Sequence, residues 1–167
     1  MTSSQVALTR ERLCECLFYD PDSGLFTWKL NHKRKKAGEI AGSLHKQDRY
    51  IIITIDYIPH RAHTLAWFYM YGVYPRGLDH INRIRSDNAI KNLRLATKFE
   101  NAKNRKLNSN NKSGYKGVSW KPSKLRWVSS IKNNNKIYYL GLHKTKEKAY
   151  QAYCLAASRL HGEFASV

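Results

Sequence analysis

The chain has 167 residues, with 30 Lys and Arg against 12 Asp and Glu, a formal net charge of +18 and an isoelectric point near 10. This excess opposes compaction and favours a polyanionic partner, because a cation that meets a phosphate releases condensed counterions. The chain has no apolar run of about 18 residues, the length needed to span a bilayer. Its first residues lack the apolar core of a signal peptide, so we expect an intracellular protein.

The cysteines are Cys14, Cys16 and Cys154, and no C-x-x-C pair occurs. They are therefore expected to be free thiols in a reducing compartment, not ligands of a zinc knuckle. Apolar residues make up 42% of the chain, which also has 11 Tyr, 5 Phe and 4 Trp. This content can build packed cores and excludes a disordered basic tail.

The first quarter of the chain predicts a helix, a turn and a strand. Residues 7–18 have apolar side chains close to helical spacing, and residues 20–24 (DPDSG) have the composition of a turn. Residues 25–28 are expected to form a strand. A loop rich in Lys, Arg and Gly follows, and it contains the basic run 33–36, which is typical of a solvated loop.

The next segments predict a hairpin and a short buried helix. Residues 50–55 are aromatic and β-branched, which makes them the strongest strand of the first half, and residues 58–62 form the expected return strand. Residues 63–71 predict a helix that ends at Gly72.

A polar linker and a compact module complete the chain. Residues 108–113 (NSNNKS) contain no apolar side chain, which indicates a linker. Three short strands are predicted at residues 115–120, 126–132 and 136–141. A helix at 145–161 follows, with Thr145 as its N-cap and Gly162 just beyond its end.

Residues 79–101 combine polar side chains with two strands and a helix start. Asp79 and His80 lie in the segment 78–82, between a Pro/Gly turn and a polar loop, and a second strand begins at Asn92, 12 residues after His80. Thr97 and Glu100 have the spacing of a capping box, which predicts a helix from residue 98. Asn101 then lies in the first turns of that helix and can face back onto the hairpin.

The text DHINRIRSDNAIKNLRLATKFENAKN, residues 79–104, resembles the HNH nuclease motif, a ββα-metal unit. It is most similar to the His-Asn-Asn variant of phage and intron-encoded homing endonucleases. The preceding stretch AHTLAWFYMYGVYP, residues 62–75, is also similar to that group. Together the two segments make the resemblance more specific than an isolated Asp-His pair.

The resemblance implies a role for each matching residue. His80 would be the general base that activates water, and Asn92 would tie the loop between the strands and so orient His80. Asp79 and Asn101 would bind one divalent cation, and their oxygen donors favour Mg²⁺ or Mn²⁺. His63 matches an upstream histidine of the family, which we interpret as a packing or phosphate-contacting residue.

Residues 114–157 resemble the plant ethylene-response-factor, or Apetala-type, DNA-binding domain, which also occurs at the C-terminal end of phage HNH endonucleases. The resemblance depends on Tyr115, Gly117 and Val118, on Trp127, and on Tyr139-Leu140-Gly141 before the capped helix. The family inserts the outer face of its sheet into the major groove of DNA.

Strand alternation assigns the side chains of this module to two faces. The residues expected to pack on the helix are Val118, Trp120, Trp127, Ser129, Ile131, Tyr138 and Leu140. The residues expected to bind DNA are Lys116, Ser119, Lys121, Arg126, Ser130, Lys132 and Tyr139. Positions 116, 121 and 132 are Lys where the family typically has Arg, and this weakens the expectation of base-specific reading but not of phosphate anchoring.

The sequence therefore predicts an α+β protein with an HNH domain at residues 1–107, a linker at 108–113 and a DNA-binding domain at 114–167. The predicted function is metal-dependent, site-directed cleavage of double-stranded DNA, as by a homing enzyme, without a small-molecule cofactor. We expect a monomer or a weak homodimer, in which one active site cuts one strand.

Other functions fit the composition less well. A non-catalytic DNA-binding regulator on a degenerate HNH fold is the main alternative, and the complete Asp79, His80 and Asn101 set argues against it. RNA binding is disfavoured because a sheet enters the major groove of B-form DNA and not that of A-form RNA. Membrane binding is disfavoured because no basic amphipathic helix is present.

Overall fold

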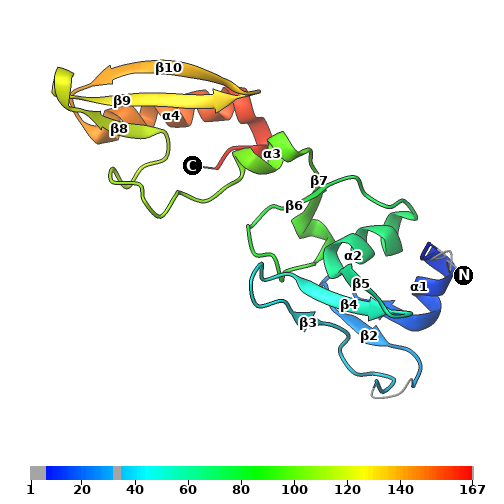
Figure 1. Ribbon diagram of the computed structural model, residues 1–167. Coiled ribbons are helices and arrows are strands. Elements are labelled where there is room, and N and C mark those ends of the chain that lie inside the picture. Colours follow the sequence, from blue (N-terminus) through cyan, green and yellow to red (C-terminus); the bar gives the residue numbers. More distant parts are fainter. Residues whose placement is uncertain (1–6, 32–34, 167) are drawn as a thin grey trace, which may run out of the picture. The chain divides into compact units, whose positions relative to one another are not determined.

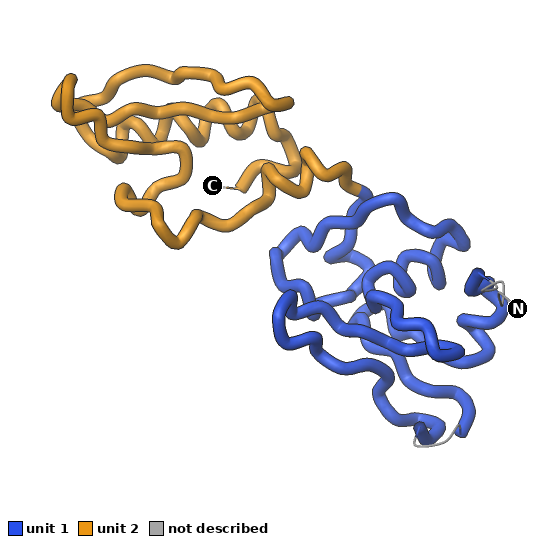
Figure 2. The backbone as a smooth tube through the Cα atoms, viewed as in Figure 1, with its two compact units in different colours: residues 1–95 blue, residues 96–167 orange. Residues whose placement is uncertain are grey.

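The computed structural model describes residues 7–31 and 35–166, so Lys33 and Arg34 of the basic run lie outside the described residues. It is a mixed fold with helices and four small antiparallel sheets among the described residues (Figure 1). The chain divides into two compact units, residues 1–95 and 96–167 (Figure 2). The division precedes the linker expected at 108–113 by one short helix, and the boundary of the functional domains stays a prediction.

The first unit begins with helix α1 (Arg10–Cys16), which is shorter than the predicted segment 7–18. Thr9 caps it by accepting a hydrogen bond from the backbone N–H of Arg12. The chain then becomes extended in strand β1 (Leu17–Tyr19), which pairs antiparallel with β2 (Phe26–Trp28). The helix ends early because Leu17 pairs with Trp28.

A second sheet carries the predicted hairpin. Strands β3 (Ser43–Leu44), β4 (Ile51–Ile55) and β5 (Ile58–Arg61) are antiparallel, with β4 in the centre. Helix α2 (Ala62–Tyr71) follows β5 directly and ends at Gly72, which adopts the left-handed conformation with φ 70°. The prediction of a hairpin followed by a helix that ends at this glycine is therefore confirmed.

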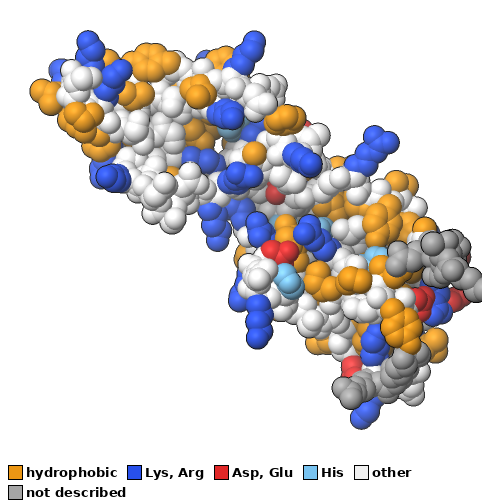
Figure 3. Space-filling view, viewed as in Figure 1, with side chains coloured by type: hydrophobic (Ala, Val, Ile, Leu, Met, Phe, Trp, Pro, Cys, Tyr) orange, Lys and Arg blue, Asp and Glu red, His pale blue; other side chains and the backbone are white. Residues whose placement is uncertain are grey.

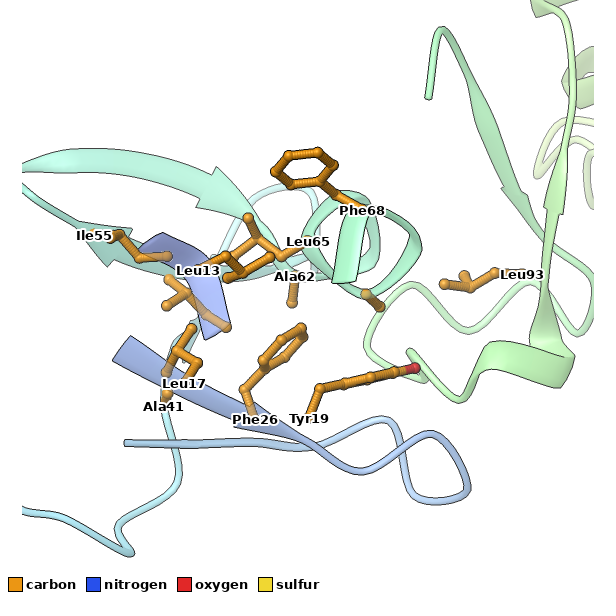
Figure 4. Close-up of a cluster of buried hydrophobic side chains, with 12 residues drawn as sticks. Leu13, Leu17, Tyr19, Phe26, Ala41, Ile55, Ala62, Leu65, Phe68 and Leu93 are labelled. Carbon is orange, nitrogen blue, oxygen red and sulfur yellow. The ribbon is translucent and has the colours of Figure 1, made fainter. Parts of the chain in front are cut away.

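The core of the first unit lies between these elements (Figure 4). Its buried side chains come from α1, α2 and three of the small sheets, and they include Leu13, Leu17, Tyr19, Phe26, Ile53, Leu65 and Leu93. The ring centroids of Tyr19 and Phe26 lie 4.6 Å apart. Burial of these apolar groups stabilises the unit by roughly 1.5–3 kcal/mol for each large side chain.

The segment with the HNH resemblance forms a hairpin followed by a helix. Strand β6 (Leu78–His80) pairs antiparallel with β7 (Leu93–Leu95), and a short 3₁₀ turn, η1 (Ile90–Asn92), precedes β7. Helix α3 (Lys98–Lys103) belongs to the second unit. Thr97 and Glu100 form both hydrogen bonds of the predicted capping box, which is confirmed.

The second unit is a three-stranded sheet with a helix. Its strands are β8 (Val118–Lys121), β9 (Arg126–Asn133) and β10 (Lys136–His143), with β9 in the centre. The 3₁₀ turn η2 (Pro122–Lys124) joins β8 to β9. Helix α4 (Lys146–His161), capped by Thr145 as predicted, covers one face of the sheet, and η3 (Gly162–Phe164) follows it (Figure 1).

On the helix-facing side of this sheet, the burial of side chains agrees with the predicted alternation at some positions but not at others. Val118, Ser129 and Ile131 are buried. Trp120 and Tyr138, which were expected to pack on the helix, are 44% and 42% exposed. Both lie on edge strands, and a single helix of about 10 Å diameter covers the middle of a three-stranded sheet best.

Gly117 explains the close approach of α4 to the sheet. It has φ 71°, and a Cβ at this position would overlap the ring of Tyr153. Its carbonyl also accepts a hydrogen bond from the N–H of Ser130 at 2.9 Å. A side chain here would therefore separate helix and sheet.

Cys14, Cys16 and Cys154 are free thiols, as predicted, and each is half-buried. Within residues 7–31 and 35–166, no helix has the length and apolar character needed to cross a membrane.

Candidate active site

The Asp79 carboxylate is held by an arginine on the neighbouring strand. Asp79 pairs with Arg94 in the register of β6 and β7, and its Oδ2 accepts hydrogen bonds from Nε and Nη2 of Arg94 at 3.0 and 2.7 Å. Asp79 is only 9% exposed. A buried carboxylate needs such a partner, because removing an unpaired charge from water costs several kcal/mol.

His80, the next residue of β6, is 5% exposed and bonds to a different side chain. Its Nε2 lies 3.2 Å from Oδ1 of Asn88, a residue that is itself 2% exposed. The Nδ2 of Asn88 donates to the carbonyl of Ser86 at 3.3 Å, which orients Oδ1 toward the imidazole. Because Oδ1 can only accept, Nε2 carries the proton and Nδ1 carries the basic lone pair.

The electrostatics around His80 keep the ring neutral. Burial lowers the pKa of His80, and the hydrogen bond that His80 donates to Asn88, together with the charges of Asp79 and Asp87, only partly opposes this shift. A neutral imidazole at physiological pH is the form that can accept a proton.

Two more aromatic rings surround His80. The His63 ring, from the first turn of α2, lies 5.0 Å from the His80 ring, edge to face. The Tyr50 ring lies 4.9 Å from His63 and 5.9 Å from His80. Burial, followed by the charges of His80 and Arg61, lowers the pKa of His63 to about 3, so this ring is also neutral.

The Asn92 side chain bonds to the backbone at two points of the loop between β6 and β7. Its Oδ1 accepts from the N–H of Asn82 at 3.0 Å, and its Nδ2 donates to the carbonyl of Asp87 at 2.8 Å. Asn82 also donates from Nδ2 to Oδ2 of Asp87 at 2.6 Å. This is the geometry that a loop-tying role requires, and its effect on catalysis stays a prediction.

The turn between β1 and β2 supports the same loop from the core side. The Tyr19 hydroxyl donates to the carbonyl of Asn88 at 2.7 Å, and Figure 4 shows this ring pointing toward the segment that leads to Leu93. The N–H of Ile90 donates to the carbonyl of Pro21 at 2.9 Å. Gly24 touches the backbone so closely that a Cβ would overlap Asn88 and Ala89.

Asn101 lies in α3, in the second unit, and its role as a ligand together with Asp79 stays a prediction. Among the described residues, no group of three or more His, Cys, Asp and Glu side chains is arranged to hold a metal ion. The predicted donors, one carboxylate and one amide oxygen, fit a hard cation that completes its shell with water and phosphate oxygens.

The residues predicted to bind DNA all lie in the second unit. Those exposed on the sheet are Ser119, Lys121, Arg126, Lys132 and Tyr139, while Ser130 is half-buried. Lys116 is half-buried, and its Nζ donates to the carbonyls of Lys103 and Arg105 at 2.9 and 2.8 Å. Lys and Arg side chains far outnumber acidic ones on the face shown in Figure 3.

Sequence reasoning missed three neighbours of the site. Asn88, Arg94 and Tyr50 are not among the residues that the sequence predicts for the site. The cross-strand register would have placed Arg94 opposite Asp79, but only after the hairpin had been aligned. No local signal connects Asn88 or Tyr50 with His80.

Comparison with known proteins identifies matches to two family models. Residues 60–103 match the HNH endonuclease model, and residues 113–163 match the AP2 domain model. The chain is 33% identical over 107 residues to Protein 3.8 of Escherichia phage T7, across 63% of this chain and 88% of that protein. It is 37% identical over 89 residues to an uncharacterized HNH endonuclease of Acanthamoeba polyphaga mimivirus, across 53% of this chain and 45% of that protein.

These matches coincide with the predicted site residues. The first matched segment contains the four residues Asp79, His80, Asn92 and Asn101. The second contains every residue predicted to bind DNA, from Lys116 to Tyr139.

Proposed function

The chain belongs to the HNH endonuclease family and continues into an AP2 domain, and on this premise we propose that it is a metal-dependent, homing-type endonuclease of double-stranded DNA. The observation that carries the proposal is the state of His80. Asn88 holds its Nε2, and burial lowers its pKa. An oriented neutral imidazole is what removal of a proton from an attacking water requires.

In the proposed reaction, Nδ1 of His80 takes the proton of the water that attacks the phosphodiester. Asn92 keeps the loop closed through its bonds to Asn82 and Asp87, so that Asn88 stays in place beside the imidazole. These residues therefore position the base and do not touch the reacting phosphate.

Asp79 and Asn101 are the proposed ligands of one divalent cation, Mg²⁺ or Mn²⁺. When bound, such an ion stabilises the charge that develops on the phosphate and on the leaving oxygen. Arg94 holds the Asp79 carboxylate through Oδ2 and fixes its orientation. This support makes Asp79 a rigid donor, which a site with few protein ligands needs.

The AP2 domain is proposed to anchor the enzyme on duplex DNA. Its exposed sheet presents Lys121, Arg126 and Lys132 for phosphates, with Ser119, Ser130 and Tyr139 among them. Lys116 differs from the others because its ammonium group already bonds to two carbonyls. We expect it to contact DNA weakly compared with Arg126.

One observation favours a second function. The Asp79–Arg94 ion pair partly neutralises the carboxylate that should bind the cation. In a non-catalytic DNA-binding regulator the same pair would serve stability alone.

The two functions are separated by cleavage of phage and host genomic DNA with Mg²⁺, with Mn²⁺ and with EDTA. The endonuclease predicts discrete, metal-dependent fragments, and Asp79→Asn should abolish them without weakening the gel shift in EDTA. Binding without cleavage under every metal condition would support the regulator and refute the endonuclease.

A further inference from the structure

Two arginines from different elements each contact one tyrosine ring beside His80. The Cζ of Arg61, at the end of β5, lies 4.6 Å from the centroid of the Tyr50 ring. The Cζ of Arg85, in the loop between β6 and β7, lies 5.1 Å from the same centroid. Tyr50 in turn contacts the rings of His63 and His80.

The arginines are fixed in place but only weakly neutralised. Nη1 of Arg85 donates to the backbone carbonyl of Asp48 at 3.0 Å, which carries no charge. Nη2 of Arg61 lies 3.7 Å from Oδ2 of Asp48, with half of its side chain exposed. The other oxygen of Asp48 is 2.7 Å from Nδ1 of His45. Arg61 thus shares the carboxylate of Asp48 with a histidine, while Arg85 bonds to the backbone of the same residue.

Such a pair of cations is a poor arrangement for stability alone. Two guanidinium groups on one ring repel each other, while each cation–π contact at an exposed site contributes only about 0.5–1 kcal/mol. A bound anion would remove the repulsion. Guanidinium groups present planar forks of N–H donors that match the oxygens of a phosphate.

We propose that Arg61 and Arg85, held on Tyr50, form a binding site for a backbone phosphate of the DNA next to the one attacked by the water that His80 activates. Its ligand is a phosphodiester, and the DNA origin of that ligand rests on the proposed function. The site adds to the AP2 sheet a second anchor, in the catalytic unit. The site holds the DNA strand in register with His80, and it does not supply most of the affinity for DNA.

The test compares two double variants that remove the same charge from the same part of the first unit. Arg61→Gln/Arg85→Gln removes the proposed site. Lys46→Gln/Arg49→Gln removes two exposed cations from the turn between β3 and β4, and neither side chain lies over the Tyr50 ring in the contacts described for residues 35–166. Full-length proteins bind a duplex in EDTA at several salt concentrations, and cleavage is followed at saturating DNA with Mg²⁺.

If the site exists, the plot of log K against log salt should become shallower in the arginine variant, with the magnitude of its slope reduced by about 1 to 2. The control variant should reduce this magnitude by less than half as much. Cleavage at saturation should fall roughly tenfold or more in the arginine variant and stay within about twofold in the control. Arg61→Lys/Arg85→Lys should recover the slope but not the cleavage rate, because an ammonium group cannot form the two-pronged contact.

Equal slopes for the arginine and control variants would overturn the site, whatever the cleavage data. If wild type does not cleave at all, the endonuclease proposal fails, and the difference in slope alone still decides whether the phosphate site exists. The lysine variant covers the case in which the glutamine variant fails to fold.

Discussion

At the residue scale, His63 and His80 are two imidazoles that the fold keeps neutral. His63 is 7% exposed, and its Nδ1 is buried with no hydrogen-bond partner in the described part of the chain. Burial, followed by the charges of His80 and Arg61, lowers the pKa of this ring to about 3. In the unfolded chain the same group titrates near its ordinary value of 6.5.

His63 therefore predicts a pH-dependent stability with a definite sign. Between pH 6.5 and about 3 the unfolded chain binds the proton and the folded chain does not, so this contribution is present above pH 6.5 and is lost as the pH falls. The loss is roughly 1.4 kcal/mol per pH unit. Urea unfolding at pH 8 and pH 5 should show His63→Phe gaining stability relative to wild type at the lower pH. A parallel decline in both proteins would refute the assignment.

Asn88 sets the tautomer of His80, and its removal should affect catalysis more than binding. Asn88→Ala deletes the acceptor for Nε2–H, so the imidazole can rotate or change tautomer. We expect single-turnover cleavage to slow at least about tenfold, with DNA affinity within about twofold. Asn31→Ala is the matched control, since Asn31 also holds a loop, through Ala37, but lies outside the site. Equal activity in the two variants would contradict the positioning role.

At the scale of elements, the loop between β6 and β7 depends on β1 and on the turn that follows it. Tyr19 and Pro21 bond to its backbone at Asn88 and Ile90, and Gly24 packs against it without a side chain. The turn thus connects the hydrophobic core with the residue that orients His80.

Gly24→Ala should displace that loop. The new Cβ would overlap the backbone of Asn88 and Ala89, in addition to the cost of φ 74°. We expect a loss of about 2–4 kcal/mol in unfolding free energy and a large loss of cleavage. Gly38 has φ 83°, but among the described residues no atom beyond its chain neighbours would lie within 4 Å of a Cβ, so Gly38→Ala should cost only about 1–2 kcal/mol and leave cleavage intact. Chemical unfolding and cleavage of both variants check this, and equal effects would argue against the contact.

Elements with a local signal were predictable from the sequence, and contacts set by the tertiary fold were not. The β4 strand, the Gly72 end of α2 and the Thr97 capping box each follow from adjacent residues. Strand β1 was missed because Leu17 continues an apolar helical pattern, and only its pairing with Trp28 makes it extended.

The candidate site divides in the same way. The spacing of Asp79, His80 and Asn92 is visible in the sequence because the hairpin brings near neighbours together. Arg61 and Tyr50 reach the site from another sheet, through contacts that no local pattern encodes.

At the scale of the whole molecule, the net charge of +18 makes DNA binding steeply dependent on salt. The separate contribution of the AP2 sheet can be measured with two double variants of equal charge. Arg126→Gln/Lys132→Gln alters the sheet, and Lys148→Gln/Arg159→Gln alters exposed positions of α4. The sheet variant should lower the salt slope by about 2 and the helix variant by well under 1. Equal slopes would show that DNA does not bind at the outer face of the sheet.

The most direct test of the endonuclease is a single-turnover cleavage assay of wild type and His80→Ala, with DNA binding measured on the same samples. We predict metal-dependent cleavage by wild type, inhibition by EDTA, and at least a hundredfold slower cleavage by His80→Ala with unchanged binding. Cleavage by His80→Ala at the wild-type rate would contradict the assignment of His80 as the general base.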